Sequence, residues 1–167
     1  MENEFVIKDY TFRKSHKFHQ HYAITDDLIL ETLTRQYDYI KDSLEHNVFN
    51  ITVTHDFSHV IGVTHCVECP PHHDGVYFKR RGKRPYLTRM VKGIQPKESS
   101  KCTIVVRFDS TTGGFVIITA WIGNPSKPEL GNINYFETCN DPLKEVMESA
   151  EFWLNHAMID EETEKES

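Results

Sequence analysis

The chain has 167 residues, of which 38% are hydrophobic and 26% charged, and its formal net charge is −6. This composition is typical of a water-soluble globule and excludes a disordered polymer. No apolar run approaches the roughly 18 residues that a membrane helix needs, and residues 1–4 lack the basic start of a secretory signal. We therefore expect one cytoplasmic domain without a membrane partner.

The N-terminal part should contain an arm and a helix. Residues 1–24 are polar and aromatic without a clean period, so we expect an extended arm or short strand packed on the body. A helix is expected over residues 26–46, because Thr25 supplies a capping oxygen and two acids follow it. Its apolar residues recur at helical spacing: Ile29, Leu33, Tyr37, Ile40 and Leu44.

The middle of the chain is rich in β-branched and aromatic residues, which favour strands. Strands are expected over residues 48–53, 60–67, 75–78, 86–91, 102–108 and 114–122. The last two are joined by a turn-forming segment, so they should form an antiparallel hairpin.

A final helix is expected from Asp141 and Pro142, because proline fits the first helical turn after an Asp cap. Its apolar stripe runs to Met158, and the acidic residues 160–167 should form a disordered tail. The prediction is one α+β domain over residues 1–159. It consists of an N-terminal helix, a twisted antiparallel sheet, and a C-terminal helix packed on that sheet.

Positive charge is concentrated in one segment of this acidic chain. Between Lys79 and Lys101 there are nine Lys and Arg residues and one acid, a formal charge of +8 that leaves −14 for the remainder. Such a segment attracts phosphate or carboxylate groups, although a solvated loop has a similar composition. The candidate nucleic-acid-binding residues are Lys79, Arg80, Arg81, Lys83, Arg84 and Lys92.

Thr119 and Trp121 lie two residues apart on the expected strand 114–122, which places them about 6–7 Å apart on one face. There a hydroxyl can bond a phosphate oxygen while the indole stacks on a base. The alternative is that Trp121 packs under a helix. The opposite face suits the core, because it is wholly apolar: Val116, Ile118, Ala120 and Ile122.

His65 lies in the expected strand 60–67. An imidazole titrates near neutrality and can exchange a proton with a ribose oxygen. Together with a cation and a hydroxyl it would activate the 2′-OH and stabilise a pentavalent phosphate, without metal or cofactor. A purely structural histidine is the alternative.

The four cysteines do not suggest a disulfide framework in a chain of this size without a secretory signal. Cys66 and Cys69 form a CxxC that is followed by His72 and His73, which is compatible with zinc. No second well-spaced pair accompanies it, so structural, reduced cysteines are favoured and no metal is assigned.

The order of these elements resembles the metal-independent ribonuclease toxins of the barnase–EndoU–colicin–RelE superfamily, which includes the colicin D-like toxins. The features that carry the resemblance are an early strand histidine, a Thr-Arg pair in a basic segment, and a late Thr-x-Trp string. It covers about residues 60–158.

This resemblance implies an endoribonuclease that cleaves RNA, such as tRNA, through a 2′,3′-cyclic phosphate. His65 would exchange protons, Arg89 would hold the phosphate, and Thr119 and Trp121 would orient the nucleotide. A neutralising protein partner is also implied.

Two other functions fit the sequence. One is a non-catalytic intracellular binding module, phage or mobile-element encoded, whose basic segment docks a nucleic acid or an acidic protein. The other is a zinc-containing accessory protein that uses Cys66 and Cys69 with His72 or His73.

Overall fold

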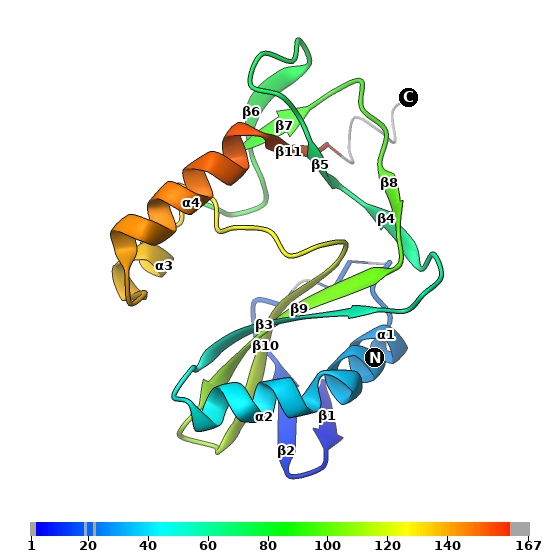
Figure 1. Ribbon diagram of the computed structural model, residues 1–167, viewed down its shortest axis with the longest axis vertical. Helices are drawn as coiled ribbons and strands as arrows, with labels where there is room; N and C mark the ends of the chain where they lie inside the picture. The colour runs from blue at the N-terminus through cyan, green and yellow to red at the C-terminus, as the bar shows by residue number, and fades with distance from the viewer. Residues whose placement is uncertain (1–2, 19, 22, 161–167) are drawn as a thin grey trace. The chain divides into compact units, whose positions relative to one another are not determined.

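The computed structural model describes residues 3–18, 20–21 and 23–160, and the chain forms two compact units (Figure 1). Unit 1 is built from Met1–Val63 and Glu98–Pro125, and unit 2 from Thr64–Lys97 and Ser126–Ser167. Helices together with largely antiparallel sheets confirm the predicted α+β class. The predicted order is wrong at the N-terminus, where two strands precede the first helix.

Unit 1 contains a five-stranded sheet in the order β1-β2-β10-β9-β3. The β2–β10 pair is parallel and the other neighbours are antiparallel, so the predicted hairpin of the last two strands is confirmed. The expected N-terminal arm contributes the β1–β2 hairpin, because its alternate side chains Phe5, Ile7 and Phe12 are buried. The bounds are β1 (Glu4–Ile7), β2 (Tyr10–Lys14), β3 (Asn50–Asp56), β9 (Lys101–Asp109) and β10 (Gly114–Ile122).

Two helices, α1 (Asp26–Arg35) and α2 (Tyr37–Glu45), pack on β3, and α1 also packs on β9 (Figure 1). The single helix predicted over residues 26–46 is therefore interrupted at Gln36, whose ψ of 8° is not helical. The Thr25 hydroxyl caps α1 as predicted, accepting a hydrogen bond from the Leu28 amide. The apolar residues of the two helices join the sheet in one core: Ile29, Leu33, Tyr37 and Ile40.

A register shift in β10 changes which side chains reach this core. The pairing with β9 shifts between Ile117 and Thr119, so the alternation of faces reverses there. Before the shift Phe115 and Ile117 lie in the core, and after it Ala120 and Ile122 do. The predicted face was therefore correct only for the second half of the strand. Thr119 is exposed and Trp121 is half-buried.

Unit 2 contains a four-stranded sheet in the order β5-β11-β7-β6. The strand predicted over residues 60–67 is divided into β4 and β5, and β4 pairs with β8 in a separate two-stranded sheet. Both β4 and β8 contain residues assigned to unit 1 as well as to unit 2. The bounds are β4 (Gly62–Thr64), β5 (Cys66–Glu68), β6 (Val76–Arg80), β7 (Leu87–Val91), β8 (Lys97–Ser99) and β11 (His156–Ile159).

Unit 2 also contains α3 (Ile133–Thr138), for which the sequence predicted no helix, and α4 (Pro142–Leu154). The Asp141 cap is confirmed, since its carboxylate accepts from the Lys144 amide. The helix ends at Leu154, not at Met158, because the last part of the expected stripe forms β11. Val146 and Leu154 of that stripe are exposed, whereas Trp153 is buried and its indole donates to the Lys127 carbonyl.

Across the described ranges, none of the helices is both long and apolar enough to cross a membrane.

Candidate nucleic-acid interface

The basic segment forms the β6–β7 hairpin at one edge of the unit 2 sheet. The strands pair antiparallel, with Phe78 opposite Arg89 and Arg80 opposite Leu87. The connection contains Gly82 at a φ of 57°, a left-handed conformation that a residue without a side chain adopts at little cost. β6 has β7 on one side only, so its other edge is unpaired within the sheet.

One face of this hairpin exposes apolar and cationic side chains together. Phe78 is 62% exposed and Leu87 60%, and Arg80, which pairs directly with Leu87, is exposed as well. Phe78 and Arg80 are two residues apart on one strand, so they point to the same side about 6–7 Å apart. An exposed ring beside an exposed cation offers a face on which a base can stack while the cation attracts the adjoining phosphate.

The cations of the segment differ in how they are engaged. Lys79 points to the other face of the hairpin, where its ammonium lies 3.0 Å from the Asp160 carboxylate. Arg84 lies 3.9 Å from Glu129, and the Lys92 ammonium lies 5.0 Å from the centroid of the Tyr77 ring. Within the part of the chain that the structure describes, Arg80 and Lys83 have no ion pair. Of the six candidate nucleic-acid-binding residues, these two are the most available to an incoming anion.

Arg89 instead has a structural set of partners. Its guanidinium donates hydrogen bonds to the carbonyl oxygens of Cys69 at 3.1 Å, Pro70 at 2.8 Å and His156 at 2.9 Å. These bonds link β7 to the end of β5 and the start of β11. Because these donors point at backbone carbonyl groups, they do not point at a bound phosphate. The geometry therefore favours a structural role for Arg89, a clamp that holds three segments of unit 2 together.

The four residues that the resemblance assigns to catalysis come from both units. His65 lies between β4 and β5 in unit 2, is half-buried, and its carbonyl accepts from the Ile159 amide at 2.8 Å. Thr119 and Trp121 lie on β10 in unit 1, where the indole donates to the Asn124 carbonyl at 2.9 Å. Neither unit by itself therefore contains all four of these residues.

The CxxC segment places Cys66 in a largely apolar environment. Burial raises the pKa of the Cys66 thiol to about 12, which favours the protonated form. The His73 Nδ1 accepts a hydrogen bond from the Gly75 amide. Among the described residues, His, Cys, Asp and Glu side chains do not gather in threes as a metal centre requires. All four cysteines are free thiols.

Phe78 is the interface residue that the sequence reading missed. It was the last residue of the expected strand 75–78, whereas β6 continues to Arg80. Continuing the alternation by two residues would have placed Phe78 and Arg80 on one face.

Comparisons with protein-family models, with curated proteins and with solved structures found no match for this chain.

Proposed function

We propose that the β6–β7 hairpin of unit 2 binds single-stranded RNA. The observation that carries this proposal is that Phe78 and Arg80 are both exposed on one face of an edge strand. Among the described residues, Arg80 has no ion pair.

The pattern supplies both contacts that a single strand offers. A base stacks on an exposed aromatic ring, and the adjoining phosphate is attracted to a guanidinium. Lys83 in the connection extends the cationic track beyond the strand. Stacking needs no particular base, so the expected binding tolerates different sequences and is strongly salt-dependent.

The exposed ring favours RNA over an acidic protein partner. Cations alone on an edge strand attract any anion, and they also prevent edge-to-edge pairing between sheets. Neither of those roles requires a phenyl ring next to the cation. Unpaired bases, in contrast, have a face that stacks on it.

The test is fluorescence anisotropy with a labelled oligouridine of about 12 nucleotides, which spans the hairpin. Loss of one stacking ring is worth about 1–3 kcal/mol, so Phe78→Ala should weaken binding about 5- to 150-fold. The matched control is Tyr39→Ala, which removes an exposed ring from α2 of unit 1 and should leave the affinity unchanged.

Two results would overturn the proposal. The first is equal affinity in Phe78→Ala and in the unaltered chain. The second is displacement of the oligouridine by polyglutamate at matched charge concentration, which identifies an acidic protein surface as the better partner. Binding by the hairpin requires neither His65 nor Arg89, so RNA cleavage stays a separate prediction of the sequence resemblance.

A further inference from the structure

Three adjacent strands of unit 1 place two arginines on either side of one buried valine. The register pairs Arg13 of β2 with Val116 of β10, and Val116 with Arg107 of β9. Residues that pair directly across neighbouring strands point to the same face. Val116 is not part of the core beneath α1 and α2, so the row Arg13–Val116–Arg107 lies on the sheet face away from that core.

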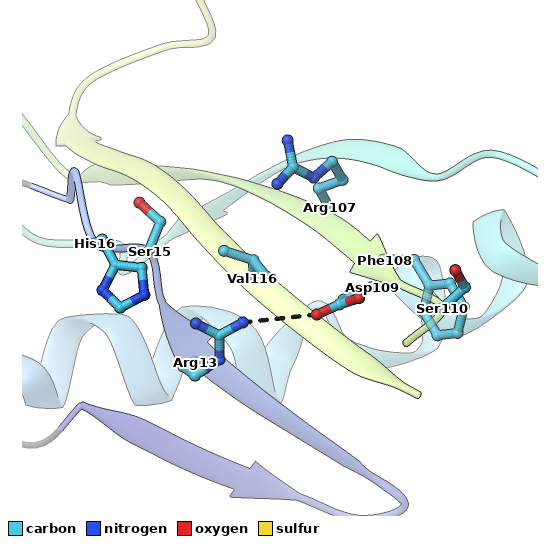
Figure 2. A pocket seen from close by; sticks show the side chains of 8 residues that line it. All are labelled: Arg13, Ser15, His16, Arg107, Phe108, Asp109, Ser110 and Val116. Atoms are coloured by element: carbon cyan, nitrogen blue, oxygen red, sulfur yellow. Dashed lines mark ion pairs between the residues drawn. The ribbon is translucent and has the colours of Figure 1, made fainter. Parts of the chain in front are cut away.

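A hollow of about 300 Å³ lies over this row. Figure 2 shows the two arginines reaching it from opposite sides of the β10 strand, with Val116 between them. Val116 is only 6% exposed, so it provides an apolar floor. The polar side chains around it are mainly basic or neutral: Arg13, Ser15, His16, Arg107, Asp109 and Ser110.

The charges around the hollow are not balanced. The Arg13 guanidinium lies 3.6 Å from the Asp109 carboxylate, which is a loose ion pair at partly exposed side chains. Arg107 is exposed and, among the described residues, its guanidinium has no hydrogen bond or ion pair. Among the residues that line the hollow, two guanidinium groups against one carboxylate leave a formal charge of +1 beside an apolar floor, where the reduced dielectric strengthens attraction to an anion. Glu4 of β1 pairs with Arg13 on the same sheet face, outside this lining.

We propose that this hollow binds the phosphoryl group of a phosphate monoester. Strands about 4.8 Å apart put the two arginines about 10 Å apart across the sheet, and each side chain is long enough to turn inward over the floor. A guanidinium presents paired N–H groups that match two phosphate oxygens, and two guanidiniums together suit a dianion. The volume is at the lower end of small-molecule sites, so it fits a phosphoryl group with a small organic part.

This proposal is independent of the RNA-binding hairpin. The row belongs to unit 1 and the hairpin to unit 2. If Phe78→Ala does not affect RNA binding, the phosphate-site proposal is unaffected. If Arg107→Gln does not affect phosphate binding, the hairpin proposal is unaffected.

The test uses the full chain and NMR titration of backbone amides around Val116 with inorganic phosphate, at an ionic strength held constant with chloride. We expect saturable shifts in the unaltered chain. Arg107→Gln should weaken phosphate binding at least about tenfold, because charge-assisted hydrogen bonds are the stronger kind. The matched control, Arg35→Gln, removes an exposed arginine that pairs with Glu31 on α1, and it should leave phosphate binding unchanged.

Asp109→Asn provides a second test with the opposite sign. The carboxylate competes with the ligand for Arg13, so its neutralisation should tighten phosphate binding several-fold. An asparagine oxygen can still accept the bond that the Thr111 amide gives to Asp109 Oδ1, so the turn should be preserved. Equal phosphate affinity in Arg107→Gln and Arg35→Gln, or weaker binding in Asp109→Asn, would overturn the proposal.

The source of the phosphoryl group is resolved by two further titrations. Adenosine 5′-monophosphate is compared with adenosine, and a 5′-phosphorylated oligouridine with its 5′-hydroxyl form. If the mononucleotide binds as tightly as the phosphorylated oligonucleotide, the ligand is a free small molecule. If only the binding of the phosphorylated oligonucleotide is weakened by Arg107→Gln, the ligand is an RNA end. Absence of an Arg107-dependent difference in both pairs counts against the site.

Discussion

The phenol of Tyr77 donates a hydrogen bond of 2.7 Å to the carboxylate of Asp160, a residue 83 positions further along the chain. Asp160 is only 7% exposed, and the same oxygen accepts a bond from the Lys79 ammonium at 3.0 Å. Tyr77 and Lys79 both lie on β6, whereas Asp160 follows β11, and β7 separates these two strands in the sheet. The cluster therefore joins the edge strand of the hairpin to the end of the described chain.

Replacing Tyr77 with Phe should lower the free energy of unfolding by about 1.5 kcal/mol, which is the low end of the net contribution of a hydrogen bond to a charged partner. Asp160→Ala should have the larger effect, about 2–3 kcal/mol, because it leaves a tyrosine and a lysine without their shared acceptor. Urea unfolding measures both, with Tyr39→Phe on exposed α2 as the control. If Tyr77→Phe and Tyr39→Phe unfold at the same urea concentration, the bond does not stabilise unit 2.

Arg89 should act on stability more than on ligand binding. Lysine cannot reproduce three hydrogen bonds that point to separate carbonyl groups, so Arg89→Lys should lower the free energy of unfolding by about 2 kcal/mol. Arg80→Lys on the same hairpin is the matched control and should leave stability unchanged, because Arg80 is exposed. Equal stability of the two variants would contradict the clamp and return Arg89 to the candidate phosphate ligands.

Local signals were sufficient for several elements of this fold. The β9–β10 hairpin follows from two β-branched runs joined by a turn, and the start of α4 follows from Asp141 and Pro142, since each signal lies within a few residues. The β1–β2 hairpin was only partly foreseen, because its apolar residues are few and the partner of β2 is β10, a strand about 100 positions further along the chain.

Other features depend on contacts that the local sequence does not encode. Residues 156–159 continue a helical pattern, yet they form β11 because β5 and β7 lie on either side of them. The register shift in β10 likewise reverses which side chains face the core. At the interface, composition identified the cations, but the pairing of Lys79 with Asp160 could be seen only in three dimensions.

Cys66 should make stability fall in alkaline solution. Burial raises the pKa of its thiol to about 12 in the folded protein, whereas its ordinary value is 9.0. Between these two pH values the unfolded chain loses the thiol proton while the folded chain keeps it, so unfolding becomes more favourable as the pH rises. The contribution of the neutral Cys66 thiol to stability is therefore complete below pH 9 and is lost as the pH rises from 9 towards 12. Urea unfolding between pH 8 and 10.5 should show a steeper loss in the unaltered chain than in Cys66→Ala, by up to about 1.4 kcal/mol per pH unit. Parallel pH profiles for the two proteins would show that burial does not hold the thiol neutral.

Cleavage of RNA is tested at His65. The protein is incubated with total RNA in chelator, and fragment ends are sequenced, with a 2′,3′-cyclic phosphate as the expected product. Removal of an acid–base group is worth about 10²- to 10⁴-fold in rate, so His65→Ala should lose cleavage to that extent while retaining Phe78-dependent binding. His72→Ala is the matched control, because this exposed histidine lies in the same unit. Cleavage by His65→Ala at the rate of the His72→Ala control would remove His65 from the reaction. Absence of fragments from the unaltered chain, with binding intact, would instead identify a non-catalytic RNA-binding protein.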